Sequence, residues 1–124
     1  MRSAFAVLLL ATYLSGQKAE PLAIEFPAGK TSASVKGELK GRQQTEYAVE
    51  AREGQSITLQ LASVPARTLQ LKLYDPRGGE APLHQSSSRR WSGGIAQNGS
   101  YTIAVIRESL RTETSKYTLT VTVH

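Results

Sequence analysis

Tyr117-Thr118-Leu119-Thr120-Val121-Thr122-Val123 alternates apolar and hydroxyl-bearing side chains without a break. In an extended chain, successive side chains point to opposite faces, so this stretch places four apolar side chains on one face and three threonines on the other. A strand of this kind lies with one face against a core and the other toward water. The stretch therefore predicts a strand of a half-buried sheet.

The same period of two recurs upstream along the chain. It is clear over 101–105, 69–73 and 57–61, and weaker over 23–26, 32–39, 45–52 and 90–95. Glycine-, proline- and asparagine-containing turn signals separate these runs, and no stretch after the first 16 residues carries an apolar stripe of period 3.6. Strands about ten residues apart are typical of a sandwich or a barrel. We expect an all-β fold, a compact antiparallel β-sandwich of about eight strands.

The first 16 residues have the three parts of a secretory signal peptide. Arg2 precedes an apolar run from Ala4 to Leu14, and small residues follow. The run is too short to span a bilayer, which takes ~20 apolar residues. We expect a signal peptide within residues 1–19, cleaved between 16 and 19, a single β-sandwich inhibitor-like domain over 20–124, and a periplasmic location.

Composition limits the partners and the sources of stability. The formal net charge is +5; without Arg2 and Lys18, 13 basic and 10 acidic residues remain, a net charge of +3. The basic residues are scattered, so nucleic acid is not an expected partner, and neither is membrane insertion. The chain has no cysteine, so the domain relies on packing without disulfides.

Residues suited to catalysis or metal binding are scarce. The chain has two histidines, and its one aspartate, Asp75, lies in an Asp-Pro-x-Gly-Gly sequence that predicts a turn capped by the carboxylate. No His, Cys or Asp cluster has metal-ligand spacing. His84 lies near Ser86-Ser87-Ser88, but a catalytic triad also needs an orienting acid. We therefore expect no enzyme activity, no metal and no cofactor.

A series of motifs extends along nearly the whole chain after the leader. It comprises Ile24-Glu25-Phe26, Gly37-x-x-x-Gly41 before Tyr47, Gly54-Gln55, Gly99-Ser100-Tyr101, and Arg107-x-x-x-Arg111 before the last strand. The series resembles the periplasmic inhibitors of goose-type lysozyme, from about residue 22 to 124. Residues 62–98 match less well, and the Gly-Gln-x-Ile and Gly-x-Tyr elements also occur in bacterial pre-peptidase C-terminal domains.

The resemblance implies a protein that blocks the active-site cleft of goose-type lysozyme with arginines. A glycosidase cleft holds carboxyl groups around the scissile bond, and a guanidinium pairs with a carboxylate through two hydrogen bonds. By resemblance, Arg107 and Arg111 are the inserting cations and Tyr47 is a supporting contact. The alternatives are solvated arginines in a loop and a tyrosine of the core or rim.

Two other functions stay open. Trp91 beside Arg90 could form a secondary contact patch for sugar or protein, or the tryptophan could pack on the sandwich. A carbohydrate- or cell-wall-binding module of the pre-peptidase type would bind peptidoglycan without lysozyme. A structural subunit of an envelope complex would neither inhibit lysozyme nor bind peptidoglycan. The sequence leaves the oligomeric state undecided.

Overall fold

A computed structural model describes residues 20–41, 43–81, 90–107 and 114–124. These residues form strands and no helix, which confirms the all-β prediction. The strands are β1 (Leu22–Ala23), β2 (Ser32–Lys40), β3 (Gln44–Ala51), β4 (Ser56–Val64), β5 (Gln70–Tyr74), β6 (Arg90–Gly94), β7 (Gly99–Ile106) and β8 (Thr114–Val123). Each predicted strand corresponds to one of these eight. The expected signal peptide, the serine run with His84, and Arg111 lie outside the described residues.

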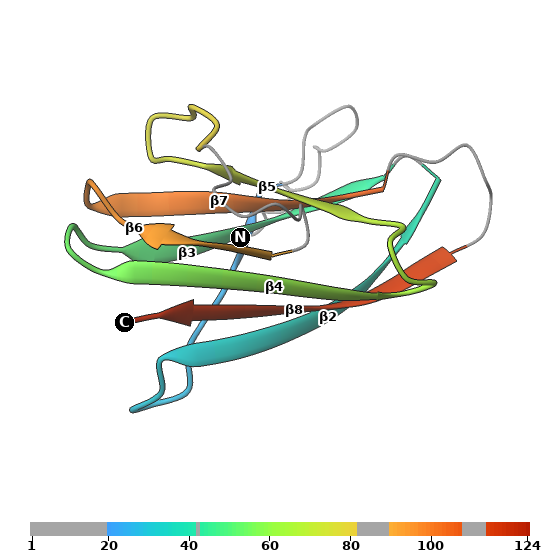
Figure 1. Ribbon diagram of the computed structural model, residues 1–124, viewed down its shortest axis with the longest axis horizontal. Coiled ribbons are helices and arrows are strands. Elements are labelled where there is room, and N and C mark those ends of the chain that lie inside the picture. The colour runs from blue at the N-terminus through green and yellow to red at the C-terminus, as the bar shows by residue number, and fades with distance from the viewer. Residues whose placement is uncertain (1–19, 42, 82–89, 108–113) are drawn as a thin grey trace, which may run out of the picture.

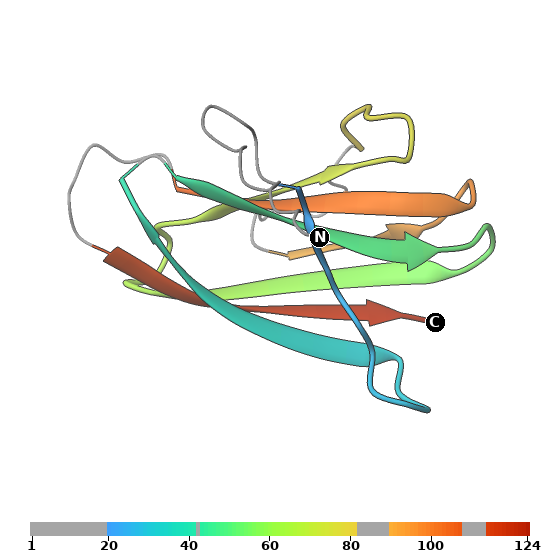
Figure 2. The same ribbon diagram turned by 180° about the vertical axis from the view of Figure 1, so that it is seen from behind.

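Two four-stranded sheets pack face to face (Figures 1 and 2). The first sheet has the order β1-β3-β7-β5 and the second has β2-β8-β4-β6. All pairs are antiparallel except the short β1–β3 pair, which is parallel. The predicted antiparallel sandwich is therefore confirmed, with this one two-residue parallel pair as a difference.

The chain changes sheet at every step. Odd-numbered strands belong to the first sheet and even-numbered strands to the second, so among the described strands no two consecutive ones pair. The connections β2–β3, β3–β4, β4–β5 and β6–β7 each join a strand that ends and a strand that begins at the same end of the sandwich, whereas β5 and β6 run in the same direction.

The core lies between the sheets and is built from the alternating apolar positions. Its most completely buried apolar side chains come from both sheets: Val49, Ile57, Leu59, Leu71, Leu73, Ile103, Val105, Leu119 and Val121. Burying one such side chain contributes ~1.5–3 kcal/mol. This core gives a stiff support for the sandwich ends.

The two ends of the sandwich differ. Strands β2, β4 and β7 end, and β3, β5 and β8 begin, at what we call the Arg107 end. The opposite far end carries the turns at 52–55, 75–79 and 95–98. At the far end, Asp75 Oδ1 accepts hydrogen bonds from the backbone N–H groups of Arg77 and Gly79, both at 2.9 Å, which confirms the predicted capped turn.

Candidate functional site

Arg107 directly follows β7 and continues its inward parity. Tyr101, Ile103 and Val105 face the core, so the next odd position also points between the sheets. Its side chain is 1% exposed, and its Nη1 donates to Ser115 Oγ at 2.6 Å. Its backbone N–H donates to the carbonyl of Gln43 at 3.0 Å. The residue therefore ties β7 to β8 and to the start of β3.

This placement differs from that of a cation exposed for insertion, the role that the resemblance implies for Arg107. The strand parity that brings the residue to the end of the sheet also turns its guanidinium inward. The Nε and Nη2 groups of Arg107 are buried and have no acceptor among the described residues. Unpaired buried donors on a charged group are costly, about 1–3 kcal/mol or more. Arg107 is thus a cation held with unused hydrogen-bonding capacity.

A chain of hydroxyl groups leads from Arg107 to the turn between β4 and β5. Ser115 Oγ donates to Thr68 Oγ1 at 2.7 Å, and Thr68 Oγ1 donates to the carbonyl of Pro65 at 2.8 Å. Sequence reasoning missed Ser115 and Thr68. The available signal was the parity of the last strand, which places the hydroxyl of Ser115 at an inward position. In the structure this side chain is completely buried.

Tyr47 is a residue of the core. It is 5% exposed, and its hydroxyl lies 2.6 Å from the hydroxyl of Tyr117 on the opposite sheet. Burial first, and then the hydrogen bond and the charge of Tyr117, raise the pKa of Tyr47 well above its usual value. The structure thus favours the core alternative for Tyr47 and makes the tyrosine pair a link between the sheets. Its expected role as a supporting contact stays a prediction.

Trp91 is also a core residue. It lies on β6 opposite Leu59 and is 4% exposed, whereas its neighbour Arg90 is exposed. The structure therefore favours packing over an exposed sugar-stacking patch for Trp91. Arg90 stays available on the surface as the predicted secondary contact.

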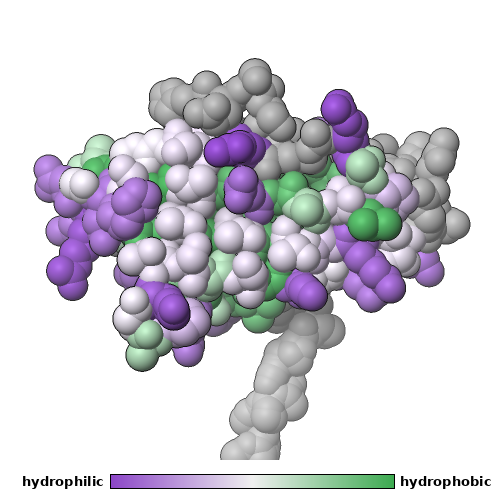
Figure 3. Space-filling view, turned by 60° about the horizontal axis from the view of Figure 1, so that its bottom comes forward, coloured by the Kyte–Doolittle hydropathy of each residue, from purple (hydrophilic) through white to green (hydrophobic). Residues whose placement is uncertain are grey.

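The outer face of the second sheet carries an array of hydroxyl groups, which we call the hydroxyl face. Across its four strands, in register, lie Ser32, Thr122, Thr58 and Ser92, and the adjoining positions add Ser34, Thr120 and Thr118. Weakly polar side chains cover the middle of this face, and strongly hydrophilic ones gather toward its margins (Figure 3). Hydroxyl pairs bridge the strands at 2.6 Å for Ser32–Thr122, 3.0 Å for Ser34–Thr120 and 3.1 Å for Thr58–Ser92.

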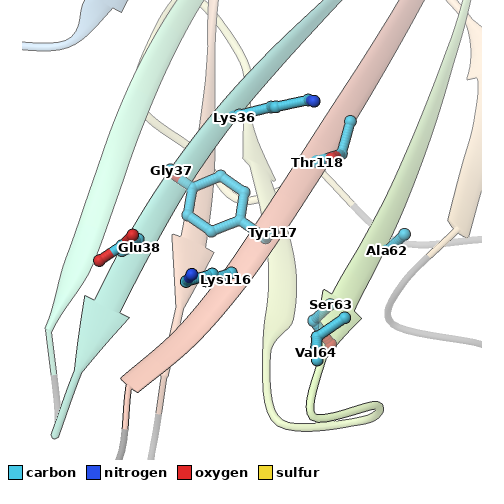
Figure 4. A pocket seen from close by; sticks show the side chains of 9 residues that line it. All are labelled: Lys36, Gly37, Glu38, Ala62, Ser63, Val64, Lys116, Tyr117 and Thr118. Atoms are coloured by element: carbon cyan, nitrogen blue, oxygen red, sulfur yellow. The ribbon is translucent and has the colours of Figure 1, made fainter.

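A shallow hollow of about 440 Å³ adjoins the hydroxyl face toward the Arg107 end. Lys36, Lys116 and Glu38 stand around it with the exposed Val64, and the ring of Tyr117 lies over Gly37 between β2 and β8 (Figure 4). Two of the three charged side chains around the hollow are lysines, which favours an anionic partner.

The described residues contain no group of three or more His, Cys, Asp or Glu side chains that could hold a metal ion. Within the same ranges, no helix is long and apolar enough to cross a membrane.

No protein-family model matches the chain, and no curated protein sequence matches it. A solved structure of a periplasmic inhibitor of g-type lysozyme from Aeromonas hydrophila does match, with a TM-score of 0.72 and 22% identity, over 84% of this chain and 96% of that one. This chain has the same fold as that inhibitor. The corresponding inhibitor of Salmonella Typhimurium matches with a TM-score of 0.70 and 21% identity, over 86% of this chain and all of that one.

A second kind of protein shares the architecture less closely. The pre-peptidase C-terminal domain of a collagenase from Bacillus anthracis matches with a TM-score of 0.60 and 15% identity, over 87% of this chain and 98% of that domain. Identities this low establish the fold. The resemblance to the inhibitors noted in the sequence is thus supported by the structure, ahead of the resemblance to pre-peptidase domains.

Proposed function

We propose that this protein is an exported inhibitor of goose-type lysozyme and that its Arg107 end contacts the enzyme's active-site cleft. The observation that carries the proposal is a shared fold with two g-type lysozyme inhibitors along 96% and 100% of their lengths. The inhibitors are described as periplasmic, in keeping with the expected leader of this chain.

The chemistry of the Arg107 end suits an acidic cleft. The Nε and Nη2 nitrogens of Arg107 have no acceptor among the described residues, so a carboxylate from a partner is a suitable acceptor for them. Arg111 follows four residues later in the sequence. We propose that these two arginines supply cations to the interface, Arg107 from a buried position.

The test is lysis of bacterial walls by goose-type lysozyme, followed by turbidity, with and without the purified protein. We expect a one-to-one complex and suppressed lysis. Combining Arg107→Met with Arg111→Ala should weaken binding, by ~2–5 kcal/mol for each charged hydrogen bond that the substitutions remove from the interface. Methionine keeps the core filled, and Arg52→Ala at the far end is the matched control. Unchanged lysis in the presence of the parent protein would overturn the function, and unchanged inhibition by the double variant would overturn only the residues.

The hydroxyl face supports a second candidate function, binding of a wall glycan. Its hydroxyls repeat at ~4.8 Å across strands and ~7 Å along them, and a glycan offers hydroxyls at comparable spacing. Lys36, Lys116 and Arg90 at its margins suit the carboxylates of peptidoglycan. The measurement is sedimentation of the protein with purified peptidoglycan.

The variant Thr118→Val/Thr120→Val/Thr122→Val removes three hydroxyls and keeps the side-chain shapes. We expect it to reduce sedimentation, while Thr102→Val on the outer face of the first sheet leaves it unchanged. Equal sedimentation of all these proteins, or none by the parent, would eliminate this second function.

A further inference from the structure

The turn between β4 and β5 presents an arginine that sequence reasoning did not single out. Arg67 is exposed at the Arg107 end, and its backbone has a φ of 64°. It is the one non-glycine residue with positive φ in the part of the chain that the structure describes. A bulky side chain in this conformation costs ~1–2 kcal/mol, and such outliers concentrate at ligand and partner sites.

Hydrogen bonds hold this turn in place. The carbonyl of Pro65 accepts from Thr68 Oγ1 at 2.8 Å and from Ser63 Oγ at 3.1 Å. The bond from Thr68 spans Arg67 in the sequence, the bond from Ser63 lies just before it, and together they restrain the backbone of this turn. A turn that is fixed before binding loses little conformational entropy when it meets a partner.

The hydroxyl chain extends this support into the core. A guanidinium only donates, so Arg107 sets the direction of every bond that follows: Arg107 to Ser115, Ser115 to Thr68, and Thr68 to Pro65. Hydrogen bonds in such a chain strengthen one another. The buried arginine thus determines which hydroxyl donates and which accepts in each bond from Ser115 to the exposed turn.

We infer that Arg67 is a further cation that contacts a carboxylate of the lysozyme cleft, and that Arg107 is a positioning residue for its turn. The inference rests on the proposed function and deepens it. Arg67 has what an inserting cation needs and Arg107 lacks in the free protein, an exposed guanidinium on a fixed backbone. The buried position of Arg107 then contributes to binding, because Arg107 holds the hydroxyl chain in place from inside the sandwich.

The first experiment measures inhibition of goose-type lysozyme by Arg67→Asn. Asparagine tolerates positive φ and removes the charge, so the fold should be retained, as thermal unfolding would show. We expect at least a tenfold weaker inhibition, an intermediate effect for Arg67→Lys, and none for the control Arg77→Asn at the far end. The salt dependence of inhibition should also be shallower for Arg67→Asn than for the parent.

The second experiment tests positioning through Thr68. Thr68→Val breaks the hydroxyl chain and should weaken inhibition several-fold, whereas Thr68→Ser should restore it. Placed in the Arg67→Asn background, Thr68→Val should have no further effect, because the group that it positions is gone. An equal loss in both backgrounds would overturn the positioning role.

The outcomes separate this inference from the proposed function. If the parent protein and Arg67→Asn inhibit goose-type lysozyme equally well, the proposed function is retained and the role of Arg67 is overturned. A parent protein that inhibits no goose-type lysozyme overturns both.

Discussion

The side chains of Tyr47 and Tyr117 form a polar contact in the largely apolar interior, apart from the buried Arg107–Ser115 bond. Their hydroxyls lie 2.6 Å apart, and the two residues are 5% and 4% exposed. A buried hydroxyl is stable only when it is paired, and each tyrosine satisfies the other across the two sheets. This pair therefore fixes how the sheets face each other near the Arg107 end.

Tyr47→Phe tests this pair through stability. It leaves the Tyr117 hydroxyl without its partner and should lower the free energy of unfolding by about 1 kcal/mol at pH 7. Urea unfolding measures this, and Tyr47→Phe/Tyr117→Phe is the control, expected to be closer to the parent because no hydroxyl is then left unpaired. If Tyr47→Phe has the same free energy of unfolding as the parent, the bond between the two tyrosine hydroxyls contributes nothing to stability.

The raised pKa of Tyr47 also predicts a pH dependence. The folded state keeps the phenol protonated, while the unfolded chain ionises it near its usual pKa of about 10. Stability from this group is therefore complete below pH ~10 and falls above it, by up to ~1.4 kcal/mol per pH unit. Unfolding measured from pH 8 to 11 should show a fall that Tyr47→Phe reduces; equal slopes for both proteins would contradict it.

Sequence reasoning located these residues better than it assigned their environments. The parity of β7 directs the side chain of Arg107 between the sheets, whereas the resemblance implied a cation that enters the cleft of a partner. The structure shows it inside, bonded to Ser115. Arg67 gave no signal, because a positive φ is expected of glycine or asparagine and not of arginine.

At the level of strands, β2 and β8 show how a glycine can serve packing. Gly37 pairs with Tyr117, whose ring lies over it (Figure 4). A Cβ at residue 37 would lie 2.6 Å from Cζ of Tyr117, closer than carbon atoms approach. The missing side chain of Gly37 is thus the space that lets Tyr117 reach Tyr47.

Gly37→Ala should therefore displace the Tyr117 ring and cost ~1–3 kcal/mol, as overpacking of a core does. Gly94→Ala on β6 is the matched control, because nothing lies within 4 Å of its added Cβ and its φ is not positive. Chemical denaturation of the two variants checks the prediction. Equal stabilities would show that the ring has room to move.

The strands were predictable because period-two alternation is a local property. β8 follows it over its whole length, whereas in β7 Ala104 and Ile106 are buried as well as the predicted inward positions Tyr101, Ile103 and Val105. β1 was the least accurate, since only Leu22 and Ala23 pair, and in parallel. Two residues give no periodicity, and the direction of pairing depends on a distant strand.

On the scale of the whole molecule, strand order could not be predicted. Every hydrogen-bonded pair joins strands that are not consecutive, from β4–β6 to β2–β8. No hairpin turn therefore reports a pairing between two of these strands. The turn at 75–79 closes a short hairpin, in which Tyr74 pairs with Glu80, but it only extends the edge of the first sheet. Pairing at such long range also predicts slow folding, in milliseconds to seconds.

The alternating topology gives the molecule two ends and a broad side with different proposed roles. Because the chain has no cysteine, one introduced cysteine is a unique attachment point for a polyethylene glycol maleimide. We expect the label on Ala66→Cys, at the Arg107 end, to abolish inhibition of goose-type lysozyme by steric exclusion. The same label on Arg77→Cys, at the far end, should leave inhibition unchanged, because the far-end turn is held by Asp75 and not by the arginine side chain.

A label on Ser34→Cys separates the hydroxyl face from the Arg107 end. Ser34 is exposed on β2 and bonded to Thr120, so the polymer would cover the middle of that face. We expect this protein to inhibit lysozyme normally and to sediment less with peptidoglycan. The unlabelled cysteine variants control for the substitutions. A rigid sandwich cannot present both ends to one cleft. If the label abolishes inhibition at residue 34 or 77 but not at residue 66, the lysozyme contact therefore lies elsewhere than the Arg107 end.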